Sequence, residues 1–299
     1  MNVLIEPQTR QERDVVSILE EINIKTLERT VLAEFDYLIE APNWTKDGTK
    51  LIYNSWGRIY SFDIASRQSK PIDTAFAVQS NNDHVLSPDC MQIAISHRTA
   101  EDGLSRIYRL PLSGGNPVLI TAMAPSFLHG WSPDGKTLAY SGQRNGKFNI
   151  FAIPAVGGVE VALTDAPGLN DGSEYSPCGK YIWFNSTRSG FMQLWRMNEN
   201  GANPVLMSQS ESNDWFPHIS PDGKWVSYIS YSRDDVKPDE HPPNKSVRLQ
   251  LMPSGGGRSI LLTDIFGGQG TMNVNSWSPD SKSLAFVSYR LKARSGGYK

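Results

Sequence analysis

The chain has 299 residues, of which 29 are lysine or arginine and 31 are aspartate or glutamate, so its net charge is −2 at neutral pH. Because acids and bases are interspersed along the chain, this balance argues against a nucleic-acid partner or an anionic membrane surface. The longest apolar run, near residues 150–156, is too short to cross a bilayer.

Six copies of one hairpin turn organise the chain. In the copy at residues 131–140, Pro133 presets φ, Asp134 can bond the nearby backbone, and Gly135 tolerates the positive φ that closes the turn. The proline position recurs at 46 (where a lysine stands), 88, 133, 177, 221 and 279, so the steps are 42, 45, 44, 44 and 58 residues. A period of about 40–45 residues with several strands per unit is typical of a β-propeller. The long last step indicates an insertion of roughly 14 residues.

The predicted strands, taken in order, begin and end with half a repeat. Residues 1–14 are polar and are expected to form a loose extension. Residues 18–26 match the third strand of the later repeats, and residues 29–32 follow as a fourth strand. After the last turn only one inner strand, at residues 283–288, remains. We therefore expect an all-β, six-bladed propeller with four antiparallel strands per blade, closed where the N-terminal outer strands pair with the C-terminal inner strands.

Topology predicts that short turns and long loops lie on opposite faces of the disc. The first-to-second and third-to-fourth turns of a four-stranded blade share one face, and the other connections share the second. We call the second face the long-loop face; it receives the loops at 98–106, 164–172 and 264–273 and the insertion at 232–246. Since function usually lies on loops held by a rigid scaffold, this is the predicted binding face. The insertion is polar and proline-rich, so it is either a solvated loop or a lid or partner arm.

Three of the five histidines stand three or four residues before a turn proline, which predicts a place at the entrance of the innermost strands, near the channel mouth. Residues at nearby positions of other repeats complete the candidate ligand-binding set: His84, His129, Glu174, His218, Asn43 and Asn275. Imidazoles beside a carboxylate can bind a divalent metal, so His84, His129 and His218 are candidate metal ligands. Because His218 is offset by one residue from the other two, strand alternation favours the alternative of plain polar channel lining. A non-metal small ligand is the third alternative.

The repeated turns resemble the WD40-like (PD40) repeats of the TolB-type β-propeller family, from about residue 15 to residue 289. The resemblance implies a single propeller domain over residues 1–299. TolB-type proteins are periplasmic and carry a separate α/β domain before the propeller, and neither that domain nor a secretory signal is visible here. We therefore expect a cytoplasmic location, or a periplasmic one if the resemblance extends that far. Oligogalacturonate lyases, which have this repeat, use histidines at the channel mouth to bind a metal.

The leading hypothesis is a non-enzymatic binding propeller that engages a protein or small ligand through the long-loop face and channel mouth. The alternative is a metal-dependent carbohydrate-active enzyme, similar to oligogalacturonate lyase, with its site at the channel mouth. The sequence contains no G-x-S-x-G elbow, P-loop, G-x-G-x-x-G or C-x-x-C motif. We expect a monomer that binds a protein or a small polar or sugar ligand. We expect no nucleic-acid partner and no membrane insertion. The only cofactor that the histidines suggest is a divalent metal. Cys90 and Cys178 are expected to be free thiols, because their repeats are not neighbours.

Overall fold

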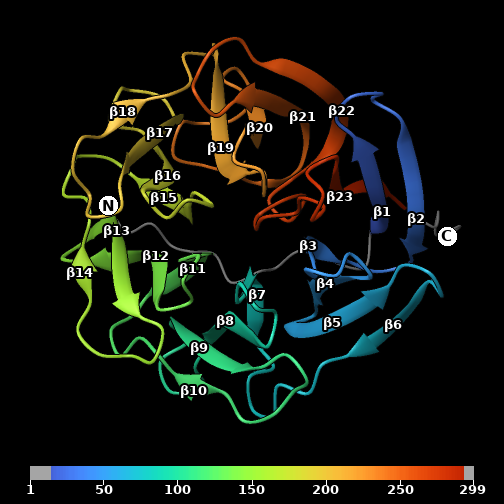
Figure 1. Cartoon of the computed structure of the whole chain (residues 1–299), viewed down its shortest axis with the longest axis horizontal. Helices are drawn as coiled ribbons and strands as arrows, with labels where there is room; N and C mark the ends of the chain where they lie inside the picture. Colours follow the sequence, from blue (N-terminus) through green and yellow to red (C-terminus); the bar gives the residue numbers. More distant parts are fainter. Residues whose placement is uncertain (1–14, 293–299) are drawn as a thin grey trace, which may run out of the picture.

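The computed structural model describes residues 15–292 and contains six β-sheets arranged as blades around one axis (Figure 1). Five blades come from consecutive segments, and each has four antiparallel strands with the first strand innermost. This confirms the predicted six-bladed, all-β propeller. None of the described residues belongs to a helix that is long and apolar enough to cross a membrane.

The strands of these five blades follow the sequence repeats. From the axis outwards, blade 1 contains β3 (Glu40–Trp44), β4 (Lys50–Ser55), β5 (Arg58–Asp63) and β6 (Gln68–Pro71). Blade 2 contains β7 (Ser80–Leu86), β8 (Gln92–Arg98), β9 (Ser105–Pro111) and β10 (Val118–Leu119). Blade 3 contains β11 (Ser126–Trp131), β12 (Thr137–Arg144), β13 (Lys147–Pro154) and β14 (Val161–Ala162). Blade 4 contains β15 (Asn170–Tyr175), β16 (Tyr181–Ser186), β17 (Gln193–Asn198) and β18 (Val205–Leu206). Blade 5 contains β19 (Ser212–Ile219), β20 (Trp225–Ser232), β21 (Pro243–Pro253) and β22 (Ile260–Gly268).

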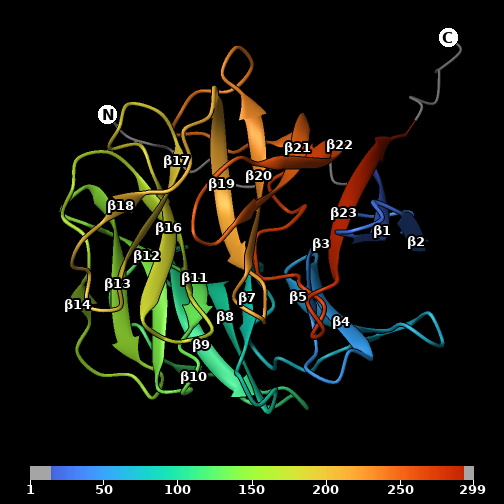
Figure 2. The same cartoon turned by 45° about the horizontal axis from the view of Figure 1, so that its top comes forward.

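Blade 6 joins the two ends of the described chain, as predicted. β1 (Val15–Asn23) pairs antiparallel with β23 (Ser283–Leu291) along its whole length, and β2 (Arg29–Phe35) pairs with the outer side of β1. The innermost segment of this blade joins β23 through a bridge between Trp277 and Leu284. Figures 1 and 2 both show β1 beside β23. The predicted loose extension at residues 1–14 lies outside the described residues.

The hydrophobic core lies between the blades. Between blades 4 and 5, for example, the fully buried Trp183 and Leu194 pack in one cluster with Ile219, Val226 and Tyr228 of the next blade. Aromatic side chains such as Trp183 and Tyr228 therefore supply packing between neighbouring blades.

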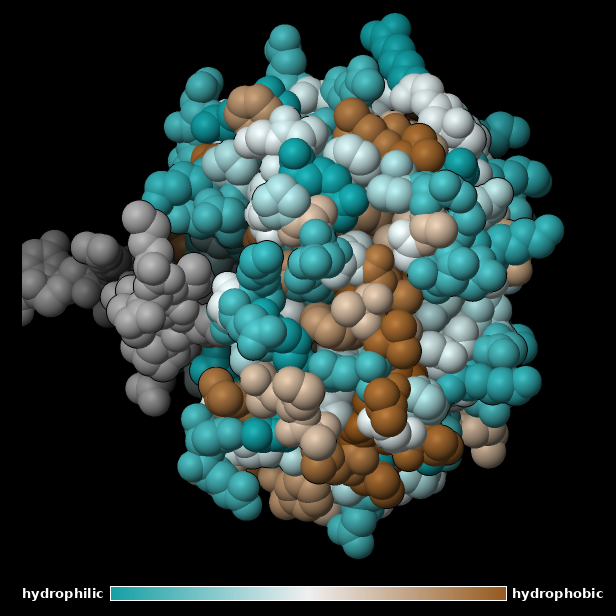
Figure 3. All heavy atoms as spheres, turned by 90° about the vertical axis from the view of Figure 1, so that its left-hand side faces the viewer, coloured by the Kyte–Doolittle hydropathy of each residue, from teal (hydrophilic) through white to brown (hydrophobic). Residues whose placement is uncertain are grey.

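The outermost strands differ in length: β22 of blade 5 and β2 of blade 6 have nine and seven residues, whereas those of blades 2, 3 and 4 are very short. The outermost strands β10, β14 and β18 each contain only two residues, which limits edge-to-edge pairing. Figure 3 faces the rim on the side of β14 and β18 and shows apolar surface in a band between polar regions. The exposed large apolar side chains on β14, on β18 and in the turn before β14 are Val156, Val159, Val161 and Val205.

Each short turn is held by the motif that predicted it. In blade 3 the Ser132 hydroxyl donates to Asp134 Oδ1 at 2.7 Å, and Asp134 Oδ1 accepts the amide of Lys136 at 3.1 Å. The amide of Thr137 donates to Ser132 Oγ at 2.9 Å, which starts the next strand. Gly135 then closes the turn at a φ of +74°, which confirms the predicted left-handed conformation.

Replacing this glycine tests the turn directly. A Cβ added to Gly135 or Gly223 would meet nothing within 4 Å, so only the backbone conformation opposes a side chain there. We expect Gly→Val at either position to lower the free energy of unfolding by about 1–3 kcal/mol, and Gly→Asn to lower it less, because asparagine tolerates positive φ. Urea denaturation measures both. Equal losses for valine and asparagine would contradict the turn assignment.

Candidate functional site

The predicted histidines lie deeper in the innermost strands than expected. His84, His129 and His218 are the fifth residue of β7, the fourth of β11 and the seventh of β19, so the prediction that they stand at strand entrances is wrong. The reason is a β-bulge in each of the five innermost strands β3, β7, β11, β15 and β19, which adds residues between the strand entrance and the turn. A bulge also re-aims the side chains on either side of it.

The predicted residues of blades 4, 5, 6 and 1 form a chain of contacts that crosses the blade boundaries. Glu174 Oε2 lies 2.7 Å from His218 Nδ1, and Glu174 Oε1 accepts both the amide of Ile219 at 2.8 Å and Asn275 Nδ2 at 2.7 Å. The Asn43 side-chain amide donates in turn to the Asn275 carbonyl oxygen at 2.5 Å. We call these four residues, Glu174, His218, Asn275 and Asn43, the inter-blade belt. All four are at least half-buried, so the belt ties the innermost strands to one another.

The contacts of His84 and His218 do not unite the predicted metal ligands. His218 Nε2 lies 3.1 Å from the Met272 carbonyl oxygen, so both of its ring nitrogens face oxygen acceptors. His84 Nε2 lies 3.3 Å from the Ile52 carbonyl oxygen, and burial lowers the pKa of His84 to about 4. Within residues 15–292, no three His, Cys, Asp or Glu side chains are arranged to hold a metal ion. A metal ion bound jointly by His84, His129 and His218 therefore remains a prediction from the sequence.

A second group, which we call the channel cluster, lies nearer the entrances of the innermost strands. It contains Asp83, His129, Asp171, Phe216, His241 and Asn273, which come from five different blades. His129 Nε2 lies 2.8 Å from Asp171 Oδ1, across the boundary between blades 3 and 4. Asn273 Nδ2 donates to Asp83 Oδ1, although blade 1 separates their two blades in the ring. The His129 and Phe216 rings, from blades 3 and 5, are 6.3 Å apart between centroids.

The insertion of blade 5 reaches this cluster. His241 packs its ring against Trp215 and Phe216, with centroid distances of 4.4 and 5.3 Å. Its Nε2 lies 4.0 Å from Asp171 Oδ2, on the carboxylate whose other oxygen faces His129. The side chains of Asp171 and His241 are 13% and 25% exposed, so the cluster is open to solvent there. The insertion therefore contributes one side chain, His241, to the channel cluster, whereas its Val236 packs against blade 5 itself.

The charges of the channel cluster are not balanced. Burial would raise the pKa of Asp171, but the charge and hydrogen bond of His129 outweigh it and hold that pKa well below its usual range. Burial would likewise lower the pKa of His129, but Asp171 raises it. Asp83 is 4% exposed and is bound by the amides of Asn81 and Asn273, and burial raises its pKa to about 6. Within the described residues no Lys, Arg or His forms an ion pair with Asp83.

Sequence reasoning found only part of this cluster. His129 was a candidate, whereas Asp83 of β7 and Asp171 of β15 were not among the candidates. Phe216, His241 and Asn273 were missed, because nothing in their spacing shows that the bulges and the insertion bring them to the axis. An excess of Asp and Asn at the start of the innermost strands could have pointed to Asp83 and Asp171, but no such signal marks Phe216 or His241.

The comparisons with known proteins agree with this architecture. A family model described as the TolB beta propeller domain (PD40) matches residues 121–258. An uncharacterized protein of Agrobacterium fabrum is 46% identical over 274 residues, covering 91% of this chain and 92% of its own length. A solved structure from Agrobacterium tumefaciens, of a protein provisionally named TolB, has a TM-score of 0.89 at 45% identity and covers 92% of this chain and 99% of that one. The chain belongs to the TolB-type β-propeller family.

More distant TolB-type relatives are longer or share the fold alone. The Tol-Pal system protein TolB of Francisella tularensis is 26% identical over 208 residues, which cover 67% of this chain. The match spans 47% of that relative, about half its length. A solved oligogalacturonate lyase in complex with manganese has a TM-score of 0.55 at 11% identity, covering 93% of this chain and 91% of that one, which shows a common fold only.

Proposed function

We propose that this TolB-type propeller is a non-catalytic binding protein whose channel cluster receives a basic side chain of a protein partner on the long-loop face. The observation that carries the proposal is Asp83, a buried carboxylate that forms no ion pair among the described residues; the nearby charge that acts on it is His129, which is already paired with Asp171. A buried charge is costly unless it is paired, and a lysine or arginine of a partner would supply the pair. Asp171 adds a second carboxylate at the solvent-exposed side of the cluster.

A protein is favoured over a free small ligand for two reasons. The Francisella relative is named a Tol-Pal system protein, which places it in a system with other proteins. The insertion also brings His241 to the channel cluster, and loops held by a rigid scaffold commonly form recognition surfaces. A partner could therefore bind the loops broadly and place one basic side chain at the axis.

Binding should depend on pH through Asp83. Its folded pKa of about 6 lies above the ordinary value of an aspartate, so below pH 6 the free protein holds this carboxyl neutral. A cation needs the ionised form, so its binding releases the proton. Affinity should then rise as pH increases towards 7, and it should fall by up to about tenfold for each pH unit below 6.

The test compares two variants that each remove one carboxylate charge from the long-loop face. Asp171→Asn changes the channel cluster, whereas Glu101→Gln changes an exposed residue in the loop between β8 and β9. We expect immobilised wild type and Glu101→Gln to capture the same partner from an extract of the source cells, and Asp171→Asn to capture at least tenfold less. Nα-acetyl-arginine amide should elute that partner, and capture should be weaker at pH 5 than at pH 7.

Two results would contradict the proposal. One is capture that is equal for Asp171→Asn and the Glu101→Gln control at a matched melting temperature. The other is capture that arginine amide does not reverse. Either result would place the binding determinants outside the channel cluster.

A further inference from the structure

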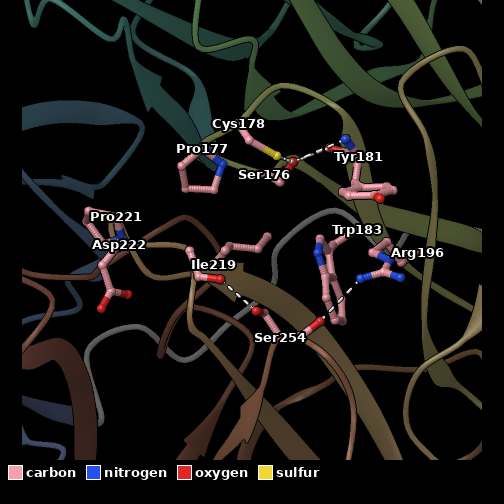
Figure 4. A pocket seen from close by; sticks show the side chains of 11 residues that line it. Ser176, Pro177, Cys178, Tyr181, Trp183, Arg196, Ile219, Pro221, Asp222 and Ser254 are labelled. Carbon is pink, nitrogen blue, oxygen red and sulfur yellow. Dashed lines mark hydrogen bonds between the residues drawn. The ribbon is translucent and has the colours of Figure 1, made fainter.

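A cavity of about 450 Å³ lies on the opposite face, between blades 4 and 5 (Figure 4). Two short turns border it: Ser176, Pro177 and Cys178 belong to blade 4, and Pro221 and Asp222 to blade 5. Its volume is in the usual range for small-molecule sites, about 300–1,000 Å³. The innermost strands separate this cavity from the long-loop face, so it is independent of the channel cluster.

Arg196 supplies a positive charge at this cavity. Its guanidinium carbon lies 4.5 Å from the ring centroid of Tyr181 and 5.8 Å from that of Trp183, so the aromatic rings hold it in place. Nη1 donates a 3.3 Å hydrogen bond to the Ser254 carbonyl oxygen. No carboxylate in residues 15–292 forms an ion pair with Arg196. The cavity's own acid, Asp222, is already bound to Ser220 Oγ at 2.7 Å and faces the Lys224 ammonium at 3.2 Å.

A half-buried guanidinium without an ion-pair partner can bind an anion. Stacking on aromatic rings uses the face of the guanidinium and leaves N–H groups at its edge, and that edge matches the two oxygens of a carboxylate. The other walls of the cavity are mixed. Trp183, Ile219, Pro177 and Pro221 supply apolar surface, and Ser176, Asp222 and Ser254 supply polar groups. Figure 4 shows Arg196 beside Trp183 at one side of the cavity and the two proline turns at the other.

We propose that this cavity binds a small amphipathic carboxylate. The carboxylate pairs with Arg196, and the apolar body lies against Trp183 and Ile219 between the two proline turns. The ligand class follows from Arg196, a cation without an ion pair, beside the apolar surface of Trp183 and Ile219: this combination selects one acid group joined to an apolar frame.

The two cysteines provide a reporter and its internal control. Cys178 lies on the cavity wall and is exposed, and the hydrogen bond from Ser176 lowers the pKa of its thiol. Cys90 stands at the same kind of turn in blade 2, where burial raises the pKa of its thiol. An occupied cavity should therefore shield Cys178 from a neutral alkylating reagent and leave Cys90 unaffected. Neither thiol takes part in the proposed recognition.

The experiment measures iodoacetamide alkylation of both cysteines by peptide mass mapping, with 2-naphthoate as the probe. We expect saturating 2-naphthoate to slow Cys178 alkylation at least fivefold and to leave the rate at Cys90 unchanged. The uncharged 2-naphthamide, which has the same shape, should protect at least tenfold less well at equal concentration. Unchanged alkylation of Cys178 with millimolar 2-naphthoate, or equal protection by the amide, would overturn the proposal.

Variants of Arg196 separate recognition from folding. Arg196→Gln should abolish the protection by 2-naphthoate, and Arg196→Lys should retain part of it, because lysine keeps the charge and loses the planar edge. Circular dichroism and the unchanged Cys90 rate report whether each variant is folded. If 2-naphthoate still fully protected Cys178 in a folded Arg196→Gln variant, Arg196 would not bind the carboxylate, and the proposal would be overturned. These outcomes do not depend on the channel cluster or on a protein partner.

Discussion

Deletion of residues 1–34 is expected to leave no soluble, cooperatively folded protein. The deletion removes β1 and all of β2 except Phe35, so β23 loses its nine residue pairs with β1 and exposes an unpaired edge. Leu19 of β1 is fully buried in a cluster that also contains Ala285 and Val287 of β23 and Leu51 of blade 1. The loss would therefore open blade 6 and its seam with blade 1 together. Soluble yield and thermal unfolding followed by circular dichroism measure the effect.

Point variants also test whether the N-terminal strands close the ring, and they leave residues 1–14 in place. Leu19→Ala should lower the free energy of unfolding by about 2–5 kcal/mol, because it leaves a cavity in the seam. Val31→Ala in β2 is the matched control: this side chain is 47% exposed, so the change should stay within about 0.5 kcal/mol. A truncated protein that melts cooperatively at the full-length temperature would refute ring closure by the N-terminal strands.

The fold could be predicted because its signals are local and repeated. A proline that fixes φ, an aspartate that caps the turn and a residue at positive φ, usually glycine, mark the hairpins, and at most one of the three is replaced in any copy. Their period counts the blades. Even the closure was visible, since residues 18–32 and 283–288 are complementary halves of one unit. In blade 4, Cys178 stands where the other turns have aspartate, and Ser176 Oγ still lies 3.3 Å from its sulfur, so the turn survives the change.

The site could be predicted only in part, because its geometry depends on irregularities that leave little trace in the sequence. The bulged residues Ala41 and Phe216 have φ of 54° and 59°, yet neither residue type signals a left-handed conformation. If the bulges in β19 and β15 are ignored, strand alternation places His218 and Glu174 at the wrong depth along the channel. The contact of Asn273 with Asp83 spans the channel, and no spacing within one repeat encodes a distance between blades that are not neighbours.

The belt changes the role that the sequence suggested for Glu174. This side chain is 9% exposed and accepts hydrogen bonds from the Ile219 amide and Asn275 Nδ2, and its other oxygen faces His218 Nδ1. One carboxylate therefore joins blades 4, 5 and 6. Both nitrogens of His218 face oxygen atoms, one on Glu174 and one on the Met272 backbone, so this buried imidazole is held from both sides.

Glu174→Ala should accordingly be among the most destabilising single substitutions in the channel. It leaves a buried imidazole, a backbone amide and a side-chain amide without their acceptor, and the loss of one partner of a buried pair costs about 3–5 kcal/mol. Glu174→Gln keeps the shape and an oxygen acceptor but removes the charge, so a loss of about 1–3 kcal/mol is expected. Glu199→Ala removes an exposed glutamate of the same blade and should change the free energy of unfolding by less than about 0.5 kcal/mol. If Glu174→Ala unfolds at the same urea concentration as Glu199→Ala, the belt does not hold the blades together, and Glu174 regains its place as a candidate ligand-binding residue beside His218.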